Sequence, residues 1–153
     1  MDAGTSDLVT KPVERELVIT RVFDAPRSLV FEAWAKPEHM VRWWGPSGFT
    51  LPTCEMDFRP GGAYRLNMRS PQGREYGVKG VYREVVVPER IVFTCILDHN
   101  PHEVLTTVTF AEHGGKTTLT VRQVFRAESD ATRGAQQGWS ESLDRLAEHL
   151  SKA

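Results

Sequence analysis

Residues 130–151, DATRGAQQGWSESLDRLAEHLS, decide the fold predicted for this chain. Trp139, Leu143, Leu146 and Leu150 recur at steps of four, three and four residues, which is the spacing of one face of an α-helix. The sequence therefore predicts a long C-terminal helix with a single apolar face. The residues before it must supply the surface on which that face packs.

A second stripe of this helix consists only of small residues. Its members are Ala131, Gly134, Ala135, Gly138 and Ser142. Each glycine inside a helix costs about 0.5–1 kcal/mol relative to alanine, so two glycines need a reason. Two explanations are open at this point. The glycines allow close backbone packing or mark a poorly formed first turn, or they leave room for a molecule that is not protein.

The chain begins with a predicted strand and a short helix. Residues 17–23 are rich in β-branched side chains and are typical of a strand. Pro26 suits the first position of the helix that follows, and Val30, Phe31 and Trp34 share its buried face.

A second short helix is predicted from Pro37, with Gly45 as its C-cap. It carries Trp43, and the loop that follows presents one aromatic side chain, Phe49.

Residues 53–125 alternate between apolar and polar side chains, as strands with one wet face do. Pro60 and Gly61 fit the central positions of a type II turn, and the other connections are also short. Strands joined by tight turns predict an antiparallel sheet. The predicted strands are 54–58, 64–69, 76–87, 91–97, 104–110 and 116–125.

The predicted architecture is α+β. A curved antiparallel sheet of about six to seven strands wraps around the long C-terminal helix, with two short helices after the first strand. We expect one domain at 14–153, preceded by a disordered tail at 1–13, because 153 residues suffice for one ordinary domain. A sheet that grips a long helix encloses a volume between the two.

Composition excludes several classes of partner. The chain has 19 Lys and Arg against 20 Asp and Glu, a net charge of -1, and no run of like charges, so we expect no nucleic-acid or membrane partner. Cys54 and Cys95 lie in apolar runs without metal-type spacing, and we expect reduced core thiols. The first residues lack the apolar core of a signal peptide, and no apolar run is long enough to span a membrane. We therefore expect a cytoplasmic protein, either a monomer or a homodimer.

Several linked motifs in order resemble the Hsp90 ATPase activator homologue-like (AHSA1-like) family of the START/Bet v 1-like (SRPBCC) superfamily. The resemblance covers roughly residues 16–151. The matching segments are 23–26 (FDAP), 30–34 (VFEAW), 37–38 (PE), 43–44 (WW), 57–62 (DFRPGG), 88–94 (PERIVFT) and 138–139 (GW), with Leu143 and Leu146.

The resemblance implies the helix-grip fold of that superfamily, with a hydrophobic cavity between the sheet and the long helix. Members include lipid and hormone binders, aromatic-ring cyclases and co-chaperone domains, and the fold does not choose among them. The eukaryotic activator carries an additional N-terminal domain, whereas here about fifteen residues precede the first predicted strand, so we expect no activation of Hsp90.

We therefore expect non-catalytic binding of a small hydrophobic or aromatic molecule in the cavity. The alternatives are a co-chaperone-like interaction module with a protein partner, and a cyclase-like or hydrolase-like enzyme that uses a tyrosine or histidine of the cavity. Strand alternation and the fold analogy predict the lining residues Trp43, Phe49, Met68, Tyr76, Phe93, Gln123, Gly134, Gly138 and Trp139.

Gln123 is the first polar candidate among these residues. It lies between Val121 and Phe125 in strand alternation, which places an amide on the apolar face. A buried amide without partners costs about 1–3 kcal/mol, so its polar atoms must bond to protein, water or ligand.

No committed catalytic group, metal site or cofactor site is predicted. The run 98–103, DHNPHE, has metal-ligand residue types but is predicted as a connection between strands, where polar residues are common. His39 is predicted on a helix surface, because the sequence places no carboxylate or nucleophile to work with it. No nucleophile elbow and no phosphate-binding glycine loop occurs.

Overall fold

The computed structural model describes residues 15–98, 100–125 and 131–152, without the side chains of 15, 100–102 and 131–134. The predicted tail at 1–13 lies outside the described residues. None of the described helices is both long and apolar enough to cross a membrane.

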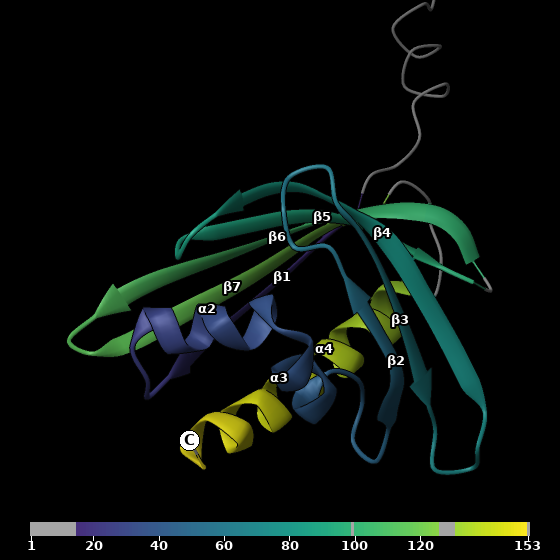
Figure 1. Cartoon of the computed structure of the whole chain (residues 1–153), viewed down its shortest axis with the longest axis horizontal. Coiled ribbons are helices and arrows are strands. Elements are labelled where there is room, and N and C mark those ends of the chain that lie inside the picture. The colour runs from purple at the N-terminus through teal and green to yellow at the C-terminus, as the bar shows by residue number, and fades with distance from the viewer. Residues whose placement is uncertain (1–14, 99, 126–130, 153) are drawn as a thin grey trace, which may run out of the picture.

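Seven strands form one antiparallel sheet in the order β1-β7-β6-β5-β4-β3-β2, and Figure 1 shows the helices on the concave side of this curved sheet. This arrangement confirms the predicted α+β helix-grip fold. The elements are β1 (Arg15–Phe23), α2 (Arg27–Ala35), α3 (Pro37–Trp43), β2 (Thr50–Met56), β3 (Ala63–Arg69), β4 (Glu75–Val86), β5 (Arg90–Leu97), β6 (Asn100–His113), β7 (Lys116–Phe125) and α4 (Ala131–Ser151).

The hairpin turns follow the glycines of the sequence. At the β2–β3 connection Gly61 has φ +85°, and the Gly62 amide donates to the Arg59 carbonyl at 2.8 Å. These are the features of the predicted type II turn, in which only a residue that tolerates positive φ fits the third position.

Several boundaries differ from the prediction. The strand predicted at 54–58 is β2, Thr50–Met56, and the C-cap of α3 is Trp44 rather than Gly45. Pro26 is the N-cap of α2 rather than its first residue, because its ψ of 153° is extended.

The run 98–103 is mostly strand: β6 begins at Asn100, which pairs with Leu97 of β5, and Asp98 lies in the turn between the two strands. Asp98 is held at that turn by two hydrogen bonds from the Arg65 guanidinium, of 2.8 and 2.6 Å.

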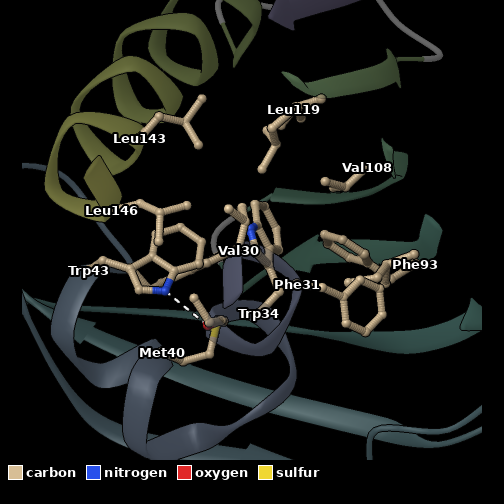
Figure 2. Close-up of a cluster of buried hydrophobic side chains, with 14 of the residues drawn as sticks. Val30, Phe31, Trp34, Met40, Trp43, Phe93, Val108, Leu119, Leu143 and Leu146 are labelled. Carbon is tan, nitrogen blue, oxygen red and sulfur yellow. Dashed lines mark hydrogen bonds between the residues drawn. The ribbon is translucent and has the colours of Figure 1, made fainter. Parts of the chain in front are cut away.

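The core lies between the helices and the concave face of the sheet. The predicted buried face of α2 is confirmed, since Val30, Phe31 and Trp34 are 0%, 3% and 3% exposed. Figure 2 shows these side chains meeting Leu143 and Leu146 from α4 and side chains from the sheet.

The predicted apolar stripe of α4 is also confirmed. Leu143 and Leu146 are fully buried and Trp139 is 8% exposed, while Leu150 packs against the core from the rim. The indole of Trp139 stacks on that of Trp34, with ring centroids 5.8 Å apart and planes 18° from parallel. Trp139 therefore joins α4 to α2.

Polar contacts hold α4 on two flanks. Asp144 accepts a 2.6 Å hydrogen bond from Arg21 of β1. On the other flank, the Arg145 guanidinium donates to the carbonyls of Trp44, Gly45 and Pro46 at 3.3, 3.0 and 3.1 Å. These contacts fix the position of α4 between β1 and the loop that follows α3.

Replacement of Trp139 by alanine should lower the free energy of unfolding by about 3–5 kcal/mol, as large core truncations do. Urea denaturation of wild type and Trp139→Ala measures the difference. Val22→Ala is the control: this β1 side chain is 60% exposed, so the change should stay within about 0.5 kcal/mol. A loss below about 1 kcal/mol for Trp139→Ala would mean that the indole does not anchor the helix.

Candidate functional site

The predicted lining residues fall into separate groups on the concave side of the molecule. Trp43 and Trp139 belong to a tryptophan cluster, and Phe49, Met68 and Tyr76 to a half-buried group at one end of β3 and β4. The remaining described members are Phe93 on β5, Gln123 on β7 and Gly138 on α4. Gly134 lies in α4, within the part whose side-chain surroundings are not described.

The tryptophan cluster joins the three helices. Trp34 is its centre: it stacks on Trp139 and lies 4.8 Å from Trp43 and 6.1 Å from Trp44 between ring centroids. Trp44 meets Trp139 edge to face at 5.3 Å. Trp43 is fully buried, and its indole N–H donates to the Ala33 carbonyl at 3.0 Å, the dashed line in Figure 2. Trp43 therefore lies in the interior of the tryptophan cluster.

The structure does bring Phe49, Met68 and Tyr76 together. Phe49 and Tyr76 have ring centroids 5.9 Å apart, and Met68 lies opposite Tyr76 in the β3–β4 register. A Cβ on Gly45 would lie 3.3 Å from the sulfur of Met68 and 3.4 Å from the Cβ of Phe49. This group therefore adjoins the loop to which α4 is bound.

A small cavity lies between the first helices and the middle of the sheet. Its volume is about 10 Å³, close to the smallest space that holds one water molecule. Phe93 is the predicted lining residue that borders it. The full lining is Trp34, Met40, Trp44, Phe58, Tyr64, Leu66, Tyr82, Ile91 and Phe93.

Gln123 is 5% exposed on the concave face of β7. Its Nε2 donates to Thr106 Oγ1 at 3.0 Å, while its Oε1 is buried without a hydrogen-bond partner. The predicted amide on the apolar face is confirmed. Its partner Thr106 was not predicted, because Thr in a strand gives no sign of which neighbour it will meet.

Gly138 has room on one side: among the described residues, nothing lies within 4 Å of a Cβ built on it. On a helix, Gly138 shares a flank with Ser142 and Arg145, four and seven residues on. Ser142 accepts a hydrogen bond from the Gly45 amide at 3.1 Å, so that flank faces the loop after α3. The open space lies one helical turn before this contact, and we refer to it as the Gly138 notch.

The buried tyrosines are not poised for acid–base chemistry. Burial, aided by the neighbouring Cys95, raises the pKa of Tyr64 far above its usual range. Burial likewise raises the pKa of Tyr82. Both phenols stay protonated near neutral pH, and neither can act as a general base there.

His39 has partners that the sequence did not reveal. Its Nδ1 lies 3.1 Å from Nε2 of His149 on α4, and its Nε2 lies 3.4 Å from Oε1 of Glu32 on α2. The prediction that no carboxylate accompanies His39 is therefore wrong. Glu32 lies one helix earlier and His149 is 110 residues away, so no local pattern connects the three. Within the described parts of the chain, no cluster of His, Cys, Asp and Glu has the arrangement of a metal site.

A curved antiparallel sheet with a long helix in its grip defines a helix-grip protein. The model of the family "Activator of Hsp90 ATPase homolog 1-like protein" matches residues 24–151. The chain belongs to this family, as its sequence motifs predicted.

Solved structures agree with this assignment. A protein from Chromobacterium violaceum has 30% sequence identity and a TM-score of 0.78, covering 86% of this chain and 94% of its own. A Rhizobium leguminosarum protein has 28% identity and a TM-score of 0.76, covering 94% and 98%. The AHSA1 protein of Silicibacter pomeroyi, at 23% identity, shares the fold with a TM-score of 0.81, covering 90% and 98%. No curated protein matches the sequence.

The histidine pair predicts a pH-dependent stability. Burial, and then the charges of His39, Arg42 and Lys152, lower the pKa of His149 from 6.5. The folded state therefore binds fewer protons than the unfolded state, and the free energy of unfolding should fall as the pH drops through 6.5 toward the folded pKa.

The test is urea denaturation at intervals from about pH 7.5 to about pH 5, the range in which histidine titrates. His149→Gln should flatten this part of the profile, and His113→Gln, on an exposed hairpin, is the matched control. An unchanged slope in His149→Gln would show that the pair does not contribute.

Proposed function

We propose that this protein binds a small apolar or aromatic molecule between α4 and the concave face of the sheet, without transforming it. The observation that supports the proposal is the empty side of Gly138, where a Cβ meets nothing within 4 Å. The cavity of about 10 Å³ near Phe93 is too small for such a ligand, so the proposed site is the Gly138 notch and not that cavity.

Gly138 is not explained by close packing. Where a glycine lets two backbone segments approach each other, a backbone atom of the second segment lies against its Cα. Gly80 is such a case, with the Thr94 carbonyl beside it. Gly138 has no such neighbour, yet the residue after it, Trp139, is only 8% exposed. The glycine therefore costs helix stability without any packing gain within the protein. Room for a ligand gives that cost a reason.

Aromatic side chains lie near the Gly138 notch, together with the polar groups of Ser142 and Arg145 on the same flank. Trp139 and Trp44 meet edge to face beside it, and the loop on the same flank carries Phe49 next to Met68 and Tyr76. Binding sites for small molecules are lined mainly by such side chains, with few polar groups. Indole and phenol rings also favour offset or edge-on contact with an aromatic ligand. These contacts favour an aromatic or otherwise apolar molecule.

Gly138→Ala should raise the free energy of unfolding by up to about 1 kcal/mol, because the methyl group enters open space and alanine favours the helix. Thermal and urea denaturation measure the change. A clear destabilisation would mean that the helix closes tightly against a neighbour, since overpacking costs about 1–3 kcal/mol.

Gly138→Leu should fill the notch and abolish binding of an apolar fluorescent probe such as methylnaphthalene, while the protein stays folded. Ala147→Leu adds a larger side chain to an exposed position of the same helix and is the matched control. It should bind the probe like wild type. Failure of wild type to bind methylnaphthalene, or equal binding by Gly138→Leu, would contradict the proposed function.

A further inference from the structure

A chain of polar groups crosses the concave face of the sheet and has a fixed direction. At one end, the Tyr64 hydroxyl donates to the Thr94 carbonyl at 2.6 Å. A carbonyl oxygen can only accept, so the single phenol hydrogen is committed there. The Tyr64 oxygen also lies 3.1 Å from Cys95 Sγ. Because the phenol hydrogen is already used, the Cys95 thiol is the donor in that contact.

The same reasoning continues to the other end. Cys95 Sγ lies 3.8 Å from Thr106 Oγ1, and since the thiol hydrogen points to Tyr64, the Thr106 hydroxyl donates to the sulfur. Thr106 Oγ1 is then left as an acceptor, and Gln123 Nε2 donates to it at 3.0 Å. The Thr94 carbonyl thus determines the orientation of an amide three side chains away, and the NH₂ group of Gln123 faces Thr106.

The orientation leaves the Gln123 carbonyl oxygen unused. Gln123 is only 5% exposed, and its Oε1 is buried without a hydrogen-bond partner. Buried polar atoms without a partner are rare, and each calls for an explanation. Turning the amide over would let Oε1 accept from the Thr106 hydroxyl, but it would take that hydrogen from Cys95 and leave the NH₂ group without a partner instead. An unmatched acceptor at the end of a fixed chain is suited to a donor from outside the protein.

Strand register and the α4 contacts place Gln123 level with the helix turn at Ala135, three residues before Gly138. Gln123 pairs with Leu17 of β1, four residues before Arg21, which is about 13 Å along a strand. Arg21 bonds Asp144, and about 13 Å back along the helix from Asp144 is the turn at Ala135. Ala135 and Leu17 both pack against the core.

We propose that Gln123 Oε1 is the polar recognition point of the ligand site and accepts a hydrogen bond from a neutral hydroxyl group on an otherwise apolar ligand. This inference rests on the proposed function and names its ligand class. The polar neighbours of Gln123 in the chain, Thr106, Cys95 and Tyr64, are all uncharged donors and acceptors. A carboxylate ligand would meet a second acceptor there, and an ammonium group would be buried without a counter-charge. A phenol or an alcohol donates a hydrogen bond to the oxygen and carries no charge.

The test compares two fluorescent probes that differ in one group, naphthol and methylnaphthalene substituted at the same ring carbon, at neutral pH. Wild type should bind naphthol about five- to tenfold more tightly, the ratio that one additional neutral hydrogen bond supplies. Gln123→Met keeps the length of the side chain and removes the acceptor. It should lower the ratio to about one, while methylnaphthalene still binds.

Thr106→Val is the second variant, and it acts on the position of the amide. It keeps the Gln123 acceptor but removes the hydroxyl that orients it, so the preference for naphthol should shrink while methylnaphthalene still binds. Thermal midpoints establish that both variants are folded. If Gln123→Met does not fold, the ratio of naphthol affinity to methylnaphthalene affinity in Thr106→Val tests the role of Gln123.

The outcomes separate the two proposals. Equal binding of both probes by wild type, or a preference that survives in folded Gln123→Met, overturns the role of Gln123 and leaves the proposed function in place. An equal loss of both probes in Gln123→Met also overturns it, since the amide would then be structural. Failure of wild type to bind either probe overturns the proposed function itself.

Discussion

Every feature of this molecule depends on the clamping of α4 between β1 and the loop after α3. The concave face of the sheet is mainly apolar, and α4 is the longest described element that covers it. Arg21 holds one flank of the helix, while Arg145 reaches three successive carbonyls on the other. Both contacts act on neighbouring residues of α4, so they fix its rotation as well as its position. That rotation turns Trp139 inward and Gly138 toward the notch.

The sequence predicted the elements well, because periodicity is a local property. The stripe of α4, the buried face of α2 and the turn at Gly61 all follow from neighbours within a few residues. The site was harder to predict, since its contacts join distant segments. Thr106 is 17 residues from Gln123, and His149 is 110 residues from His39. No spacing rule covers such pairs. The run at 98–103 was misassigned for a related reason: its polar composition resembles a loop, whereas pairing with β5 makes it a strand.

The concave face combines two kinds of interior, an aromatic cluster and a row of polar groups. The tryptophan cluster is tightly packed: Trp43 donates its N–H to Ala33 and meets the rings of Trp34 and Trp44, although the buried N–H of Trp34 has no hydrogen-bond partner. The polar row is open at one end, where Gln123 Oε1 lacks a partner. The aromatic cluster and the polar row lie on different elements, so a substitution in one leaves the contacts of the other in place.

The position of β1 in the sheet also governs how the protein is made. The Thr20 and Thr120 hydroxyls meet at 3.4 Å although 100 residues separate them, and all of β1 pairs with β7 alone. On the ribosome the first strand emerges early and waits for the last one before it finds its only sheet neighbour. Such a high contact order slows folding relative to a helical bundle of this size. Until β7 emerges, the apolar side of β1 is available to chaperones and to other nascent chains, so synthesis is the period in which this fold is most exposed to aggregation.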